Sequence, residues 1–282
     1  MTPYYQDEWV TLYHGDARGE RNDRGGRDGW PVPDESAACV LFSPPYNVGL
    51  EYDEHDDVMP WHLYKQLAGM VARNAHDALM PEAGRCWVNV TPVVPVAPIA
   101  AGDHSGRGVN PRVSLLHIWD NALLAKDLGI WDYIAWTTPR GPGCAWGSWE
   151  SPSGPNMRGE WETLIAAHKG PWAREHPPEF KGWKDKVGRW IDLTSNVWRI
   201  QPQARGPEGH PAPFPQELAA RCIRLSTFPG ELVVDPFAGS GTTLLAARAL
   251  GRRAVGIELS KRYCEIAAKR LSQGSFDFEG VA

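Results

Sequence analysis

A hydroxyl residue, two prolines and an aromatic residue follow directly after a short apolar run. Residues 43–46 read Ser-Pro-Pro-Tyr and come after the run AACVLF at 37–42. Proline fixes the backbone φ angle and has no N–H, so such a loop is stiff and presents acceptors where other residues would also present a donor. The four residues predict a rigid loop at a strand end that holds one flat, polar group.

A glycine-rich turn has the residue types of a second binding site. The stretch VVDPFAGSGTT at 233–243 places Gly239 and Gly241 between a predicted strand and a predicted helix, whose first N–H groups are free to bind a ligand. Glu258 ends the next strand, at a spacing close to the roughly 20 residues at which an acidic residue meets ribose hydroxyls in dinucleotide-binding folds. With Asp235 before the turn, the pattern predicts a nucleoside site.

The sequence around the turn argues against a nucleoside triphosphate as the ligand. The stretch contains no G-x-x-x-x-G-K-[ST] sequence, so no lysine is placed to bind a β- or γ-phosphate, and ATP and GTP are disfavoured. A cofactor with a ribose and no phosphate chain fits better, and S-adenosyl-L-methionine is one. The plain structural alternative is a strand-to-helix turn that merely needs glycine, and Asp235 and Glu258 count against it.

Alternating patterns predict the elements that position these residues. Short apolar runs alternate with helix-spaced patterns, which indicates βαβ units and a mostly parallel, doubly wound α/β sheet. In helix 59–80 the expected apolar face is Leu63, Leu67, Met70, Val71 and Leu79, and 92–112 is expected to be a loop. We expect strands at 9–16, 37–42, 85–91, 130–138, 162–170, 231–237 and 252–259, and helices at 59–80, 113–129, 215–227, 241–251 and, after a Ser260 cap, 260–271.

The domain organisation follows from where this alternation stops. From Pro139 to Pro215 the chain is rich in Pro, Gly, Trp and charge, with one clear strand inside it. We therefore expect one domain over 1–282, in which an inserted segment at 139–207 separates one half at 9–138 from a second half at 208–272.

Composition limits the class of protein. Of the 282 residues 42% are apolar and 22% are charged, as in soluble globular proteins, and the net charge of −5 argues mildly against non-specific coating of nucleic acid. The five cysteines include no C-x-x-C pair, so we expect neither a disulfide framework nor a metal site. Neither a membrane span nor a signal peptide is evident, and a cytoplasmic protein is expected.

Four stretches together resemble one enzyme family. FSPPYN (42–47), HPAPFPQELAARCIRLST (210–227), VVDPFAGSGTTLLAA (233–247) and RAVGIELSKRYCEIAAKRL (253–271) look like amino-methylating DNA methyltransferases whose catalytic motif precedes the cofactor motif. The resemblance covers about two thirds of the chain. It implies a Rossmann-like class I S-adenosyl-L-methionine-dependent methyltransferase fold with permuted motif order and an inserted target-recognition region. It also implies double-stranded DNA as the partner, with a homodimer left open and no membrane.

The resemblance gives the opening loop a chemical role. Ser43 Oγ and the Pro44 carbonyl would accept hydrogen bonds from the exocyclic amino group of a flipped base. Pro45 would keep the loop stiff, and Tyr46 would offer a face to the base. Serine at the first position resembles the cytosine-N4 subset more than the adenine-N6 subset.

The resemblance also implies the cofactor contacts. Asp16 would accept from the cofactor adenine amino group, and Glu258 would bind the ribose hydroxyls. Plain alternatives are a turn cap for Asp16, a hydrophobic staple for Phe214 and a structural role for His210. The remaining contacts would be Pro213, Phe214, Asp235, Pro236, Phe237, Ala238, Gly239, Gly241 and Thr242.

Region 171–207 matches no pattern but lies where target recognition is normally found in this family. Each basic residue in it can contact DNA phosphates or bases, or be an ordinary solvated surface charge. The candidates are Lys181, Lys184, Lys186, Arg189, Arg199 and Arg205.

Other interpretations account for less of the sequence. Adenine-N6 methylation would leave the fold and most of the site unchanged. Enzymes that methylate RNA or protein amides share a similar loop, but their cofactor motif comes first in the chain. A nicotinamide-dependent oxidoreductase would not explain residues 43–46, and a non-enzymatic DNA-binding module would need no cofactor site. No Cys follows a Pro, which argues against C5 methylation through a thiolate adduct.

Overall fold

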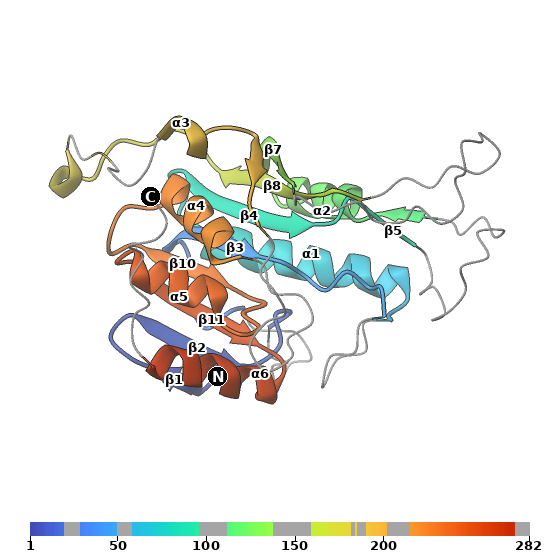
Figure 1. Ribbon diagram of the computed structural model, residues 1–282, viewed down its shortest axis with the longest axis horizontal. Helices are drawn as coiled ribbons and strands as arrows, with labels where there is room; N and C mark the ends of the chain where they lie inside the picture. The colour runs from blue at the N-terminus through green and yellow to red at the C-terminus, as the bar shows by residue number, and fades with distance from the viewer. Residues whose placement is uncertain are drawn as a thin grey trace.

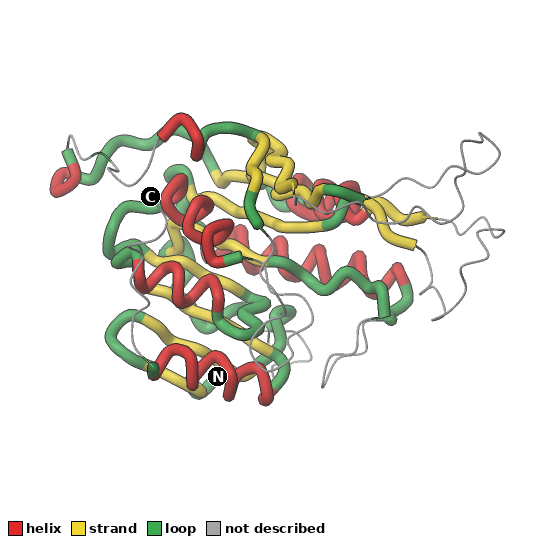
Figure 2. The backbone as a smooth tube through the Cα atoms, in the orientation of Figure 1, coloured by secondary structure: helices red, strands yellow, loops and turns green. Residues whose placement is uncertain are grey.

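A wide β-sheet forms the centre of the molecule. The computed structural model describes residues 1–19, 29–49, 58–95, 112–137, 159–181, 184, 190–201 and 215–273 of the chain. Within these residues, nine strands form one sheet in the order β1-β2-β11-β10-β3-β4-β8-β7-β9, drawn yellow in Figure 2. The strands are β1 (Pro3–Gln6), β2 (Val10–His14), β3 (Ala37–Phe42), β4 (Gly84–Val90), β7 (Gly129–Thr137), β8 (Trp161–Lys169), β9 (Val197–Arg199), β10 (Leu232–Asp235) and β11 (Arg253–Glu258).

The central strands are parallel, as the alternating pattern predicts. β2, β11, β10, β3 and β4 run in one direction, so their carboxyl ends meet at one edge of the sheet. β8 runs against both β4 and β7, and β9 runs parallel to β7. The mostly parallel α/β fold is therefore confirmed.

Helices cover both faces of the sheet (Figure 1). α1 (Trp61–Ala78) and α2 (Leu115–Leu124) pack on one face, and α4 (Gln216–Ser226), α5 (Thr242–Ala249) and α6 (Lys261–Ser272) pack on the other. Two shorter helices are η1 (Pro178–Phe180) and α3 (Trp190–Leu193). None of the helices in the described ranges is long and apolar enough to cross a membrane.

The continuous apolar sequence of β3 is explained by its position between two layers of helices. All six of its residues are buried. Val40 and Phe42 belong to the core under α1 and α2, whereas Cys39 and Leu41 belong to the core under α4, α5 and α6. A parallel strand covered on both faces needs apolar side chains at every position.

Three features differ from the expected elements. β8 was expected inside the inserted segment 139–207, but it lies between β4 and β7 and is part of the central sheet. The predicted loop 92–112 contains two short paired strands, β5 (Val93–Pro95) and β6 (Arg112–Ser114). β1 adds an antiparallel edge strand that the sequence pattern does not predict.

The buried face of α1 is also narrower than predicted. Leu67 and Val71 on the helix are buried, as is Leu79 just after it, but Leu63 is 44% exposed and Met70 is 38% exposed. Leu63 and Met70 therefore belong to the apolar pattern of the sequence but not to the core. The helix instead buries small side chains at Ala68, Ala72, Ala75 and Ala78, which allow it to lie close to the sheet.

The turn after β8 gives a test of the fold. Gly170 has a φ of +65°, and a Cβ added there would lie 2.1 Å from the Pro81 carbonyl oxygen. Gly230 has a φ of +80°, but an added Cβ would have no heavy atom within 4 Å. Gly170→Ala should therefore lower the free energy of unfolding by roughly 1–3 kcal/mol more than Gly230→Ala, the matched control for backbone strain. If denaturant titrations gave the same loss of unfolding free energy for both variants, the end of β8 would not be packed against Pro81.

Candidate active site

The carboxyl edge of the sheet brings the two predicted motifs together. Ser43 follows β3, Asp235 ends the neighbouring strand β10, and Glu258 ends β11 beside it. The rings of Phe42 and Phe237 lie 5.6 Å apart and join the two motifs. Residues almost 200 positions apart in the chain therefore share one site.

The glycine-rich turn has the conformation that its sequence predicts. Asp235 Oδ1 accepts a hydrogen bond from the Phe237 N–H at 2.9 Å, which starts the turn. Gly239 and Gly241 have φ angles of 51° and 82°, where glycine is favoured. A Cβ on Gly241 would also lie 3.1 Å from Ala267 Cβ of α6, so glycine is needed there for packing as well.

Glu258 is fixed against this turn. Its Oε2 accepts from the Gly239 N–H at 2.7 Å, and its Oε1 accepts from the Ser260 N–H at 2.8 Å. Burial raises the pKa of Glu258, while these backbone N–H groups act in the opposite direction. A carboxylate oxygen has a second lone pair, so both oxygens can still accept from ligand hydroxyls. The carboxylate is thus oriented for the ribose contact expected from the sequence.

The other residues of the turn that are predicted to contact the cofactor differ in burial. Pro236, Ala238 and Thr242 are buried and Phe237 is half-buried. Pro213, Phe214 and His210 lie outside the described residues, so their predicted roles remain predictions.

Asp16 lies at the same edge, one strand further along the sheet. The Gly15 N–H donates to the Glu258 carbonyl at 2.9 Å, which holds the end of β2 beside the end of β11. Both carboxylate oxygens of Asp16 are bound by the Arg18 guanidinium, with Nη2 to Oδ2 at 2.6 Å. An adenine amino group would share this carboxylate with Arg18.

Arg270 of α6 supports the turn and was not among the residues predicted from the sequence. Its Nη1 donates to the Ser240 carbonyl and, at 2.9 Å, to Ser240 Oγ. Burial lowers the pKa of this guanidinium. Nothing in the local sequence signals a contact between residues 30 positions apart.

The Ser-Pro-Pro-Tyr loop is held from behind. The Tyr64 hydroxyl of α1 donates to the Pro45 carbonyl at 2.7 Å, and Trp119 Nε1 of α2 donates to the Tyr64 oxygen at 3.2 Å. Asn47, at a φ of 58°, closes the loop by accepting from the Met59 N–H at 2.6 Å. The stiff loop expected from its prolines is therefore also fixed by two helices.

A polar cluster surrounds the Ser43 side chain. Ser43 Oγ lies 3.3 Å from the Asn89 carbonyl oxygen and 3.4 Å from the Tyr46 hydroxyl. Tyr46 donates to Glu162 Oε2 at 2.8 Å. Burial, and then the charge of Glu162, raise the pKa of Tyr46 well above its ordinary value. Asn89 and Glu162 come from β4 and β8, and neither was predicted from the sequence.

The described part of the predicted recognition region lies at two opposite edges. Arg199 pairs with Thr137 at the carboxyl edge and is exposed. Lys181 instead follows Phe180, whose ring stacks on Phe228 at 5.2 Å, just before β10 begins. The structure therefore does not bring Lys181 and Arg199 together. Lys184 is exposed, while Lys186, Arg189 and Arg205 lie outside the described residues.

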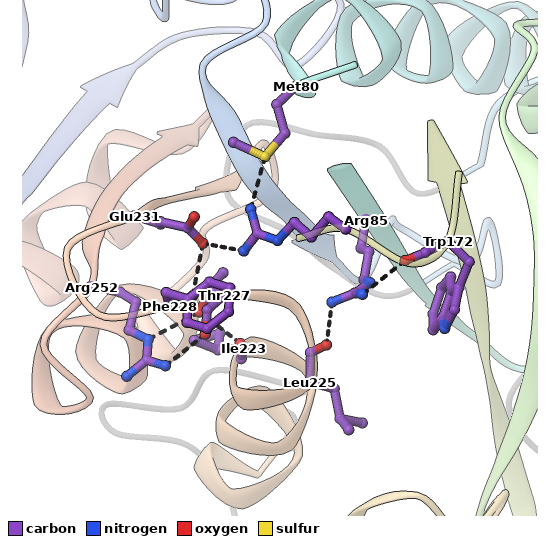
Figure 3. A network of polar contacts seen from close by, with 10 residues as sticks. Met80, Arg85, Trp172, Ile223, Leu225, Thr227, Phe228, Glu231 and Arg252 are labelled. Atoms are coloured by element: carbon purple, nitrogen blue, oxygen red, sulfur yellow. Dashed lines mark hydrogen bonds and ion pairs between the residues drawn. The ribbon is translucent and has the colours of Figure 1, made fainter. Parts of the chain in front are cut away.

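Residues 172–174 are anchored near the starts of β4 and β10 by Arg85 and Glu231, which are labelled in Figure 3. Arg85, near the start of β4, donates to the Trp172 carbonyl at 3.0 Å and lies over the Trp172 ring. Arg174 forms an ion pair with Glu231 at 2.7 Å. This part of 171–207 packs on the amino ends of the strands, away from the loop at 43–46.

Asp235 gives a pH-dependent prediction. Burial raises its pKa to about 7, and Glu258 adds to the shift. Because the folded pKa is above the unfolded value, ionised Asp235 destabilises the fold, by about 1.4 kcal/mol per pKa unit. The cost is absent below the unfolded pKa, near 4, and grows until pH passes about 7.

Asp235→Asn should therefore raise the melting temperature more at pH 8 than at pH 5, while weakening cofactor binding. Asp132→Asn, an exposed position on β7, is the control for the exchange itself. A gain that is equal at both pH values would contradict the burial of an ionised Asp235.

The chain matches a known protein family and is similar to several DNA methyltransferases. Residues 37–269 match the N6/N4 family described as DNA methylase. The chain is 29% identical over 286 residues to the type II methyltransferase M.ScaI of Streptomyces caespitosus, with 95% of this chain and 83% of M.ScaI covered. It is 24% identical to the DNA adenine methyltransferase YhdJ of Escherichia coli K12, with 96% and 85% covered.

A solved structure extends the comparison to the cofactor. TTHA0409 of Thermus thermophilus, solved in complex with S-adenosyl-L-methionine, superposes with a TM-score of 0.66 at 27% identity, and the match covers 93% of each chain. The turn at 235–241 and the loop at 43–46 both lie within the range that the family model matches. The chain belongs to the N6/N4 DNA methylase family and is an S-adenosyl-L-methionine-dependent DNA methyltransferase that acts on an exocyclic amino group.

Proposed function

We propose that this methyltransferase acts on cytosine N4 in double-stranded DNA. The observation that carries the proposal is Ser43 at the first position of the loop, where a serine resembles the cytosine-N4 subset of the family. The hydroxyl is held at the carboxyl edge, directly after β3, which is the strand next to β10 and its glycine-rich turn.

The chemistry requires acceptors at this point. The lone pair of an exocyclic amino group is delocalised into the ring, which makes the nitrogen a poor nucleophile. Acceptors on both N–H bonds stabilise the positive charge that develops as the nitrogen becomes tetrahedral. Ser43 Oγ and the Pro44 carbonyl would supply these acceptors, and proline offers no competing N–H.

The base would have to leave the duplex to reach them. Tyr46 is half-buried and packs on the apolar core under α1 and α2, so its ring is fixed rather than free in solvent. A fixed aromatic face is a suitable surface for a flipped base. Of the predicted DNA contacts, Arg199 is exposed at the same edge, where it could contact a DNA phosphate.

The cofactor contacts follow from the turn. Glu258 presents an oriented carboxylate to the ribose hydroxyls, and Asp16 would bind the adenine amino group. Asp235, Phe237 and Gly239 would line the remainder of the site. When bound, S-adenosyl-L-methionine supplies a methyl group on a positively charged sulfur.

Adenine N6 is the second candidate. The relative YhdJ is described as a DNA adenine methyltransferase, and the same loop chemistry serves either base. The two proposals share the fold, the cofactor and the roles of Ser43 and Pro44, and differ only in the base.

Nucleoside analysis separates the two. The wild-type protein and Ser43→Ala would be expressed in a host without its own DNA methylation, and the host DNA digested for mass spectrometry. We expect N4-methylcytosine from the wild type and a level lower by about 100-fold or more from Ser43→Ala, on the order of the loss of one transition-state hydrogen bond. N6-methyladenine in its place would overturn the choice of base. If a folded protein that binds the cofactor produced neither methylated base, the proposed DNA substrate would be wrong and RNA would be tested next.

A further inference from the structure

Four polar side chains from the loop and two strands meet behind the predicted target position. Tyr46 donates to Glu162 Oε2 at 2.8 Å, and Asn89 Nδ2 donates to the same oxygen at 2.8 Å. Asn89 Nδ2 also lies 3.1 Å from the Tyr46 oxygen. Ser43 Oγ is 3.4 Å from that oxygen. Asn89 and Glu162 have no part in the function proposed above.

The donors and acceptors of this cluster can be counted. An ionised carboxylate accepts only, so the single proton of the Tyr46 hydroxyl points to Glu162. The Tyr46 oxygen then accepts, and Asn89 Nδ2 supplies one of its donors. The opposite orientation of the Asn89 amide would place its oxygen against the Glu162 carboxylate, which is unfavourable.

This order fixes the direction of the Ser43 proton. Three polar atoms lie near Ser43 Oγ: the Asn89 main-chain carbonyl oxygen at 3.3 Å, the Tyr46 oxygen at 3.4 Å and Asn89 Nδ2 at 3.5 Å. The two oxygens can accept the Ser43 proton, whereas Asn89 Nδ2 directs its two hydrogens to the nearer oxygens of Glu162 and Tyr46. The Ser43 hydroxyl therefore donates toward the protein, and its lone pairs remain for the group in front of it. In this arrangement the Ser43 hydroxyl can accept a hydrogen bond from a substrate N–H.

Resting on the proposed function, we infer that Glu162 is a positioning residue of the catalytic loop. Through the Tyr46 hydroxyl, its carboxylate makes Ser43 an acceptor for the target amino group and also fixes the Tyr46 ring. Hydrogen bonds to an ionised group are about twice as strong as neutral ones, so a carboxylate orders the chain of hydrogen bonds better than an amide would.

A neutral substitute of the same size should break this order. In Glu162→Gln the amide nitrogen can donate to the Tyr46 oxygen, which frees the Tyr46 proton to point toward Ser43 or the Asn89 carbonyl. Ser43 would then lose a lone pair to Tyr46 and present its own proton to the substrate. The matched control is Glu160→Gln, an exposed glutamate two residues earlier in the chain.

The test measures single-turnover methyl transfer to DNA at saturating S-adenosyl-L-methionine. We expect Glu162→Gln to reduce the rate constant about 10- to 100-fold, as for the loss of one charge-assisted hydrogen bond, and Glu160→Gln to leave it unchanged. The cofactor Kd, measured by calorimetry, should be unchanged in both variants.

A double-mutant cycle separates positioning from a general structural role. If Glu162 acts through the Tyr46 hydroxyl, Tyr46→Phe should lower the rate by a similar factor, and Glu162→Gln should add little in the Tyr46→Phe background. Should Glu162→Gln not fold, Tyr46→Phe must still show that loss. The inference would be overturned if the rate losses of Glu162→Gln and Tyr46→Phe multiplied in the double variant. It would also be overturned if Glu162→Gln transferred methyl groups as fast as Glu160→Gln.

Failure of the proposed function would look different. If the wild type methylates adenine, the base assignment fails but the cycle still tests Glu162, because both amino groups need the same acceptors. A wild type that transfers no methyl group to any DNA would overturn the proposed function and this inference together.

Discussion

The parallel pairing of β3 with β10 is the constraint on which the site depends. Val233 and Val234 pair with Cys39 and Val40, on strands almost 200 residues apart in the chain. This register places the loop at 43–46 and the turn at 235–241 on one edge. Without this register the loop at 43–46 and the turn at 235–241 would not lie beside one another.

The edge concentrates acidic groups in a region of low solvent exposure. Burial raises the pKa values of Asp235 and Glu258, and backbone N–H groups from the turn only partly offset this. Such a site favours a ligand that brings hydroxyl donors and positive charge, and S-adenosyl-L-methionine has both. The core beside this edge is closely packed around Gly256, where an added Cβ would lie 2.8 Å from Leu244 Cδ1.

Much of this arrangement could be predicted from local sequence. Short apolar runs such as β3 and turn residues such as Gly239 and Gly241 act within a few positions, so the pattern indicates both the element and its end. The parallel order then requires that the carboxyl ends meet. The Ser260 cap of α6 is confirmed in the same way, because its side chain accepts from the Tyr263 N–H at 3.3 Å.

The unpredicted residues act across the sheet. Glu162 reaches Tyr46 only because β8 inserts antiparallel beside β4, and no local signal in a Pro- and Gly-rich segment indicates this. Arg270 reaches Ser240 from a helix whose pattern indicates only amphipathic packing. Leu63 and Met70 are exposed because alanines, which carry little weight in a hydrophobic pattern, make the close contact of α1.

If the loop at 43–46 performs methyl transfer while the turn at 235–241 holds the cofactor, variants in the two motifs should lose different properties. Cofactor Kd by calorimetry and single-turnover methyl transfer to DNA would be compared for Ser43→Ala and Glu258→Ala. We expect Ser43→Ala to keep the wild-type Kd and lose transfer, and Glu258→Ala to weaken cofactor binding. Full transfer by Ser43→Ala, or an unchanged Kd in Glu258→Ala, would contradict this division of roles.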